Sequence, residues 1–230
     1  LEPDEGGLRW LLGTSLLRVN DGAAAEKEFR RAHELGFETA EFDAELLRSL
    51  LLQQKYDEAI SHDHVRPTAL SRTLRGYALL AKRNFEQAVS AFNKVLEEDA
   101  KFLRAHLGIV EVFIRQKELQ KAEQGLEQAA LIEPDNSLII RARGELAAAE
   151  RDFAAASKYF SDYLEKESYD LPARLALARS LLALGDTKQA GSHLGIARTT
   201  LGDDPRVVYL EALRHFNEED YTGAIAKLES

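Results

Sequence analysis

One short phrase returns along this chain at a nearly constant interval. In residues 84–99 it reads NFEQAVSAFNKVLEED, with the small Ala88 followed four residues later by Phe92 and three further on by Val95. The equivalent alanines of the other copies are Ala25, Ala59, Ala122, Ala156, Ala190 and Ala224. Successive copies are 34 residues apart, except that Ala59 and Ala88 are separated by 29. A period of this length is typical of helix–turn–helix solenoids, in which each repeat packs mainly on its neighbours.

Numbering each repeat so that the recurrent alanine is position 20 divides the chain into units. We expect an all-α chain with a single solenoid domain over residues 1–230 and units at 6–39, 40–68, 69–102, 103–136, 137–170, 171–204 and 205–230. Position 8 is mostly small and position 24 mostly large and apolar, which lets two helices approach closely while a bulky side chain fills the space beside the crossing. A polar turn residue precedes the second helix and is expected to cap it, at Asn84, Asp152, Asp186 and Asp220.

These positions resemble those of the tetratricopeptide repeat (TPR). The resemblance rests on a small residue at position 8, Ala at 20, Phe or Leu at 24, Ala at 27 and Pro at 32, and it covers essentially the whole chain. It implies a right-handed α-solenoid superhelix of about seven units, with the first helix of each unit lining a concave groove. The chain departs from the family pattern in two ways: Trp10 lies one place after position 4, and only Pro3 and Pro134 occupy position 32. TPR units that bind the C-terminal carboxylate of chaperones have Lys at position 5 and Asn at position 9. No unit of this chain has that pair of residues.

A narrower resemblance involves two segments. Residues 11–13 and 25–37 (LLG and AEKEFRRAHELGF), together with residues 204–224, look like the TPR protein of exosortase (PEP-CTERM) systems, the PrsT-like lipoproteins. Those proteins are encoded with the exopolysaccharide and protein-sorting machinery of Gram-negative bacteria. The resemblance implies a non-catalytic scaffold of the bacterial envelope or periplasm that supports exopolysaccharide assembly, export or protein sorting. Two alternatives stay open, a peptide-binding adaptor in the cytoplasm and a direct binder of an acidic polysaccharide.

Composition narrows the classes of function further. A net charge of −9 argues against nucleic acid as a partner, because phosphates demand a basic face. No stretch approaches the roughly 18 apolar residues that a membrane span needs. The chain has no cysteine, which excludes disulfides and thiolate zinc sites. Hydrolase elbows, phosphate-binding glycine loops and zinc-protease motifs do not occur, so we expect neither an enzyme nor a cofactor.

The short interval between Ala59 and Ala88 has a local cause. Residues 61–67, SHDHVRP, interrupt the expected second helix, and Pro67 cannot lie inside a helix. We expect this helix to be shorter by about a turn and a half, through a tolerated deletion or a kink that shapes the groove. His62, Asp63 and His64 make a poor metal site, because ligands two residues apart do not share a helix face.

Both ends of the chain read like the interior of an array. Residues 1–4, LEPD, match residues 132–135, IEPD, at the end of an internal repeat. The sequence closes inside an expected helix, and neither end carries the atypical unit that caps a solenoid. We expect a piece of a longer array.

The TPR resemblance places positions 2, 5, 9, 12 and 13 of each unit on the concave side. These positions hold seven arginines and three glutamates, which predicts a partner segment with acidic and apolar side chains, or an anionic sugar. Alternatively, Leu80, Leu182 and Phe216 pack within the array. The expected groove residues are Trp10, Arg18, Arg48, Tyr77, Glu111, Arg115, Arg141, Glu145, Arg179 and Tyr209.

Overall fold

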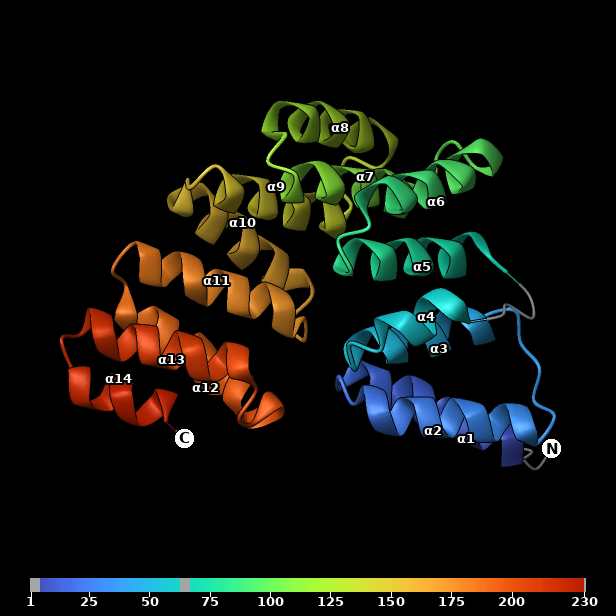
Figure 1. Ribbon diagram of the computed structural model, residues 1–230, viewed down its shortest axis with the longest axis horizontal. Helices are drawn as coiled ribbons and strands as arrows, with labels where there is room; N and C mark the ends of the chain where they lie inside the picture. The colour runs from blue at the N-terminus through green and yellow to red at the C-terminus, as the bar shows by residue number, and fades with distance from the viewer. Residues whose placement is uncertain (1–4, 63–66, 230) are drawn as a thin grey trace. The chain divides into compact units, whose positions relative to one another are not determined.

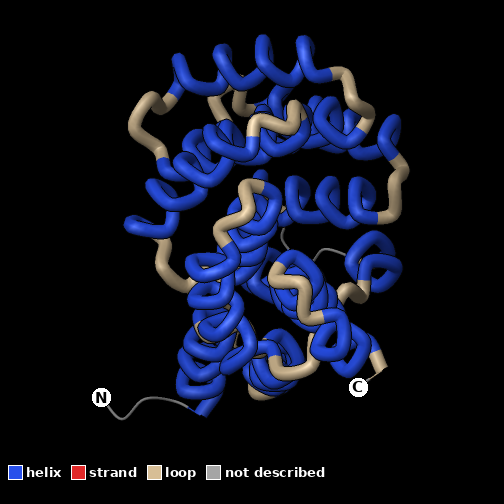
Figure 2. The backbone as a smooth tube through the Cα atoms, turned by 90° about the vertical axis from the view of Figure 1, so that its left-hand side faces the viewer, coloured by secondary structure: helices blue, strands red, loops and turns tan. Residues whose placement is uncertain are grey.

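The computed structural model describes residues 5–62 and 67–229, and across these ranges it contains helices and short loops but no strand (Figures 1 and 2). The all-α prediction is therefore confirmed. The helices are α1 Glu5–Arg18, α2 Gly22–Glu34, α3 Phe42–Leu52, α4 Tyr56–Ser61, α5 Ala69–Ala81, α6 Phe85–Glu98, α7 Leu103–Arg115, α8 Leu119–Ile132, α9 Ser137–Ala149, α10 Phe153–Lys166, α11 Leu171–Ala183, α12 Thr187–Leu201, α13 Pro205–Asn217 and α14 Tyr221–Leu228.

The helices form two compact units, residues 1–115 with α1–α7 and residues 116–230 with α8–α14. Within each unit, odd-numbered helices touch the next odd-numbered helix, as α3 touches α5 and α11 touches α13. Even-numbered helices pack only on the odd-numbered helices before and after them in the described part of each unit. The odd-numbered helices, which are the first helices of the repeats, therefore make an inner layer, since closer spacing lies on the inside of a curve.

The recurrent alanine lies at the tightest point of the packing. Six of the seven copies have no accessible surface, and only Ala224 retains 7%. The neighbouring position 24 is filled by a fully buried ring in Phe92, which lies between two glycines of the inner layer. A Cβ atom added to Gly76 or to Gly108 would come within 2.5 Å of that ring. Gly76, at position 8 of its repeat, thus leaves room for the aromatic side chain, as the sequence pattern predicts, and Gly108, at position 6 of the next repeat, does the same from the other side.

In the turn between the two helices of a repeat, the residue at position 15 has a left-handed backbone conformation. The φ angle is positive at Asn20, Gln54, Arg83, Lys117, Arg151, Gly185 and Glu219. The next residue, at position 16, is the N-cap that directly precedes the second helix.

An aspartate at that next position caps the second helix. Its carboxylate accepts from the amide three residues later, 3.0 Å away for Asp152 and 2.9 Å for Asp186 and Asp220. The prediction is wrong for Asn84, whose side chain makes no capping hydrogen bond. There α6 begins through the backbone alone, with the Ala88 amide 2.9 Å from the Asn84 carbonyl oxygen.

The irregular repeat is shorter than expected. Helix α4 has 6 residues against 14 in α6, a difference of more than two turns rather than a turn and a half. It ends at Ser61, and the following His62 places Nε2 2.9 Å from Oδ1 of the buried Asp43. This contact ties the residue after α4 to α3. Asp63, His64 and the segment of residues 1–4, on which other predictions fall, lie outside the described residues.

Candidate partner-binding surface

The predicted groove residues all lie on the inner-layer helices, yet they differ in what they contact. Two of the aromatic ones pack within the array. The half-buried Trp10 ring lies 4.9 Å from the ring of Phe29 and 5.8 Å from that of Phe37. The Tyr77 ring meets Phe92 edge-on at 5.3 Å, and its hydroxyl donates to the Arg104 carbonyl oxygen at 3.1 Å, which ties α5 to α7. These two side chains stabilise the wall of the groove more than they line it.

Four aliphatic side chains at the same positions are also packing residues. Leu80 and Leu182 at position 12 retain 1% and 2% of their surface, and position 5 is similarly buried at Leu107 and Leu175. Leu80 belongs to the buried cluster of α5, α6 and α7, and Leu175 and Leu182 belong to the one that includes α10, α11 and α13. Seam packing is therefore the correct interpretation of Leu80 and Leu182, whereas Phe216 is 58% exposed.

Most of the groove arginines are neutralised by nearby carboxylates. Arg115 donates to Glu111 one turn earlier at 2.8 Å, and Arg48 pairs with Glu45 at 3.2 Å. Arg206 pairs with Asp204 at 2.8 Å. The sequence count missed Glu45 and Asp204 because they stand outside the five groove positions. The positive charge of this surface is thus smaller than the count predicts.

Arg141 belongs to a network of ion pairs and hydrogen bonds that no sequence motif indicates. Its guanidinium lies 2.9 Å from Glu145 and 3.4 Å from Asp170, whose carboxylate also accepts from the Tyr163 hydroxyl at 2.8 Å. Asp170 at the same time caps α11 through the Ala173 amide at 2.9 Å. Burial and the Asp170 charge raise the pKa of Tyr163, so the phenol stays protonated and donates. The sequence signal was Tyr163 itself, a phenol at position 27, where three other units carry alanine.

Three groove arginines remain available to a partner. Arg18, Arg104 and Arg179 are exposed and form no side-chain ion pair in the part of the chain that the structure describes. They lie at positions 13, 2 and 9, on α1, α7 and α11. Since a guanidinium presents a planar fork that fits carboxylates, each is a ready contact for an anionic group.

Tyr209, the last predicted groove residue, is 58% exposed on α13. It occupies position 5, where Leu107 and Leu175 each retain only 7% of their surface. Tyr209 is therefore accessible, unlike the two leucines at the same repeat position.

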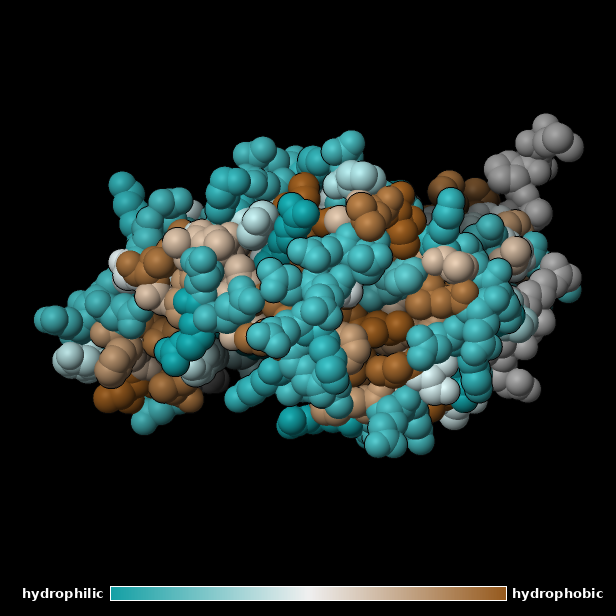
Figure 3. Space-filling view, turned by 90° about the horizontal axis from the view of Figure 1, so that it is seen from above, coloured by the Kyte–Doolittle hydropathy of each residue, from teal (hydrophilic) through white to brown (hydrophobic). Residues whose placement is uncertain are grey.

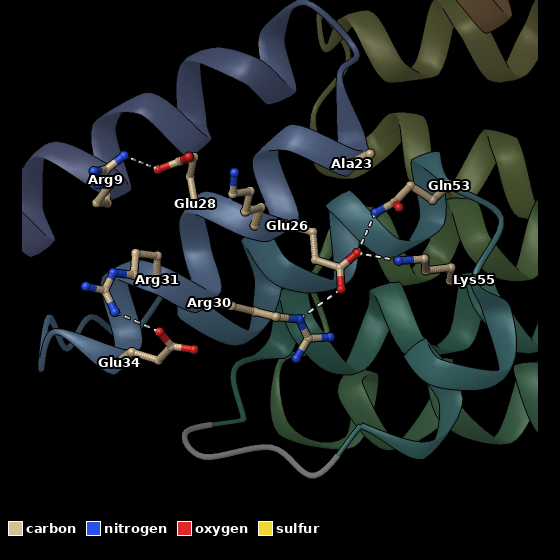
Figure 4. A pocket seen from close by; sticks show the side chains of 10 residues that line it. Arg9, Ala23, Glu26, Glu28, Arg30, Arg31, Glu34, Gln53 and Lys55 are labelled. Atoms are coloured by element: carbon tan, nitrogen blue, oxygen red, sulfur yellow. Dashed lines mark hydrogen bonds and ion pairs between the residues drawn. The ribbon is translucent and has the colours of Figure 1, made fainter.

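A charged hollow of about 710 Å³ lies elsewhere, between α1, α2 and the loop after α3 (Figure 4). Glu26 accepts there from Lys55 and Gln53 at 2.7 Å each and from Arg30 at 2.8 Å. Burial opposes ionisation of Glu26, but these donors outweigh it and hold the pKa of the carboxyl below its usual range. The other lining residues are Arg9, Ala23, Lys27, Glu28, Arg31 and Glu34. Arg9 pairs with Glu28 and Arg31 with Glu34, so the hollow is a structural salt-bridge cluster. Sequence reasoning missed it because its members come from three different elements.

Neither a metal cluster nor a membrane-spanning helix emerges from the described residues. They contain no group of three or more His, Asp or Glu side chains arranged to hold a metal ion. None of the helices described is both long and apolar enough to cross a membrane. In the view of Figure 3, hydrophobic residues appear as several brown patches separated by hydrophilic ones.

Comparison with known proteins fixes the family. The tetratricopeptide repeat family matches residues 79–146 and 147–213. The chain belongs to this family. Subunit 3 of the anaphase-promoting complex of Schizosaccharomyces pombe is 23% identical over 138 residues, which cover 60% of this chain and 21% of that protein. The chain thus spans about a fifth of the length of this curated relative.

Solved TPR structures share the fold. A thermophilic TPR protein from Thermus thermophilus superposes with a TM-score of 0.64 at 23% identity, covering 77% of this chain and 99% of that one. YrrB, described as a TPR protein with an unusual peptide-binding site, gives a TM-score of 0.50 at 18% identity over 81% of this chain and 90% of its own. The TPR solenoid is confirmed, and such a fold supports a protein-interaction scaffold.

Proposed function

We propose that the chain is a non-catalytic scaffold whose inner-layer helices bind an extended segment of a partner protein. The observation that carries the proposal is the contrast among the groove arginines. Arg48, Arg115 and Arg141 are neutralised, whereas Arg18, Arg104 and Arg179 are exposed without an ion pair in the described residues. Acidic side chains spaced along the partner would supply the missing carboxylates.

The experiment compares charge reversals on and off this surface. Binding to acidic peptides is measured on a spotted peptide library. Arg104→Glu and Arg179→Glu should each weaken it by roughly 3- to 10-fold, because an exposed ion pair contributes up to about 1 kcal/mol and the reversed charge also repels the peptide. Arg75→Glu and Arg143→Glu are matched controls, because both arginines are exposed at position 7 outside the groove set. Equal losses of affinity in all four variants would mean that only the net charge of the protein matters. Unchanged affinity in Arg104→Glu and Arg179→Glu would reject the groove as the binding surface.

The resemblance of residues 25–37 and 204–224 to the exosortase-associated TPR lipoproteins supports a location for this scaffold. The proposed location is the bacterial envelope, where the scaffold would support exopolysaccharide assembly, export or protein sorting. Fractionation of cells that produce the tagged full-length gene product tests this location. Recovery with the periplasm or membranes is expected, and recovery in the cytoplasm would favour the cytoplasmic peptide-binding adaptor instead.

An anionic polysaccharide is a second candidate ligand, because uronate carboxylates could pair with the same exposed arginines. Titration calorimetry with uronate oligomers distinguishes the two. Heat that is lost in the Arg104→Glu and Arg179→Glu variants would favour the sugar. Absence of heat, with peptide binding retained, would leave the protein segment as the ligand.

A further inference from the structure

Arg174 on α11 is a buried cation without a carboxylate partner. It retains 9% of its surface, and its guanidinium forms no ion pair with an acidic side chain in the part of the chain that the structure describes. One terminal nitrogen donates to the Ser168 carbonyl oxygen at 2.5 Å, and the other lies 3.3 Å from Nδ1 of His193 on α12. The Nε atom is buried without a hydrogen-bond partner. Because buried charges are rarely found without compensation, the position of this side chain depends on its two acceptors.

Other repeats carry complementary side chains at the same two positions. The guanidinium and the imidazole occupy positions 4 and 23 of the sixth repeat. In the first repeat, Arg9 at position 4 pairs with Glu28 at position 23 at 3.2 Å. In the second repeat, the buried Asp43 pairs with His62 at 2.9 Å. The sixth repeat instead sets a cation against a histidine, so protonation of the ring would place two positive charges together.

The side chain at position 4 also ties the loop that joins two repeats. His106, at position 4 of the fourth repeat, places Nε2 2.9 Å from the carbonyl oxygen of Ala100, at position 32 of the repeat before it. Ser168 is the equivalent of Ala100, so Arg174 holds the α10–α11 loop as His106 holds the α6–α7 loop. We call the contacts of Arg174 with His193 and with the Ser168 carbonyl the clasp.

The clasp requires a neutral imidazole. A guanidinium can only donate, so Nδ1 of His193 is the acceptor and the ring proton is on Nε2. A second proton would turn Nδ1 into a donor and set a positive ring against the Arg174 guanidinium. Burial and the charge of Arg174 accordingly lower the pKa of His193 below its ordinary 6.5.

Within the described residues, no carboxylate is placed to offset this repulsion. Helices α11 and α13 pack on α12. From α13, Arg214 lies alongside α12 and is also positive, while Glu211 is already paired with Arg198 at 2.8 Å. The carboxylates of Glu167 and Asp170, in the α10–α11 loop, accept hydrogen bonds from α9 and α10 instead.

We infer that uptake of a proton by His193 opens the clasp and releases the loop of residues 167–170. In the opened state the imidazole is free of the Arg174 guanidinium and takes up a proton more readily. The equilibrium between the closed and the opened loop therefore shifts toward the opened state as pH falls below about 6.5.

The released loop reaches the candidate groove. Its Asp170 carboxylate lies 3.4 Å from the guanidinium of Arg141 on the inner-layer helix α9. Opening of the loop loosens this hold, and an acidic partner segment would then gain Arg141 as a contact. This last step rests on the proposed function, whereas the opening of the loop does not.

Hydrogen exchange followed by NMR on the 230-residue chain without a partner tests the clasp. The Asp170 amide donates to the Glu167 carbonyl oxygen at 3.1 Å. Its protection, corrected for the intrinsic exchange rate, should fall by roughly 10-fold between about pH 7.5 and about pH 5, as a hydrogen bond from a charged group is lost. The loop after α8 is the matched control, because Asn136 donates to Glu133 at 3.2 Å in the same way and position 4 of the next helix is Ile140.

Two variants separate the clasp from other effects of pH. His193→Gln keeps an acceptor for Arg174 but takes up no proton, so its loop should stay protected at both pH values. Arg174→Gln removes the second charge, so protection of its loop should not change with pH. A wild-type loop that stays protected at low pH would overturn the inference, as would an equal loss in residues 133–136 or a pH-dependent loss in either variant. Because no partner is present, this result is independent of whether the groove binds one.

Discussion

Replacing the recurrent alanine tests packing at the level of one side chain. Ala156 has no accessible surface and lies in a buried cluster with Phe160. Ala156→Leu should therefore lower the free energy of unfolding by roughly 1–3 kcal/mol through overpacking. Ala154→Leu on the same helix is the control, because Ala154 is exposed and the change should stay within about 0.5 kcal/mol. Chemical denaturation measures both, and equal stabilities would contradict the packing described.

His193 gives a residue-scale prediction about pH. Its Nδ1 lies 3.3 Å from an Arg174 guanidinium nitrogen, and burial together with that charge lowers the pKa of His193 from its ordinary 6.5. The unfolded chain therefore takes up the proton first as pH falls. The free energy of unfolding should decrease as pH drops from about 6.5 toward the lower pKa of the folded state.

The variant His193→Gln should lose this part of the pH dependence. Urea denaturation at about pH 7.5 and about pH 5.5 measures it, with the wild type losing more stability than the variant between the two. Identical losses would show that the imidazole is not held neutral in the folded protein.

At the scale of the element, the aspartate before each second helix fixes where that helix begins. Asp152→Ala removes an acceptor for the Ala155 amide and should cost about 1 kcal/mol. Asn84→Ala is the natural comparison, because the Asn84 side chain makes no capping hydrogen bond and its loss should cost less. A thermal unfolding series that ranks the two in the reverse order would contradict this account of the turns.

The short helix α4 should be the least protected second helix of residues 1–115. It buries only Ala59, whereas α6 buries Ala88, Phe92 and Val95. Few buried contacts permit local opening, so the α4 amides should exchange with deuterium faster than those of α6. Equal protection of the two helices would mean that other contacts replace the missing turns.

At the scale of the whole molecule, the sequence predicted the array because its packing is periodic. Contacts such as that between the Phe92 ring and Gly76 form between neighbouring helices. The small and large residues that make such contacts therefore recur along the sequence with the repeat, as the alanine at position 20 does. Helix pairing could therefore be deduced from spacing alone.

The charge distribution could not be predicted in the same way. Arg141 is paired with Asp170, which is 29 residues away at the last position of the same repeat, where it caps α11. Leu182 is buried and Phe216 is 58% exposed, although both are at position 12 of their repeats. A count of residue types at each repeat position treats such residues as equivalent. Their exposure and their ion-pair partners nevertheless differ from repeat to repeat.

Photo-cross-linking from single positions tests the binding surface most directly. A photoreactive residue replaces Arg104 or Arg179 in one set of chains, and Arg75 or Arg143 in the other. The account predicts that the partner is cross-linked from positions 104 and 179 and not from positions 75 and 143. Cross-links from the second pair alone would contradict a partner bound along the inner-layer helices.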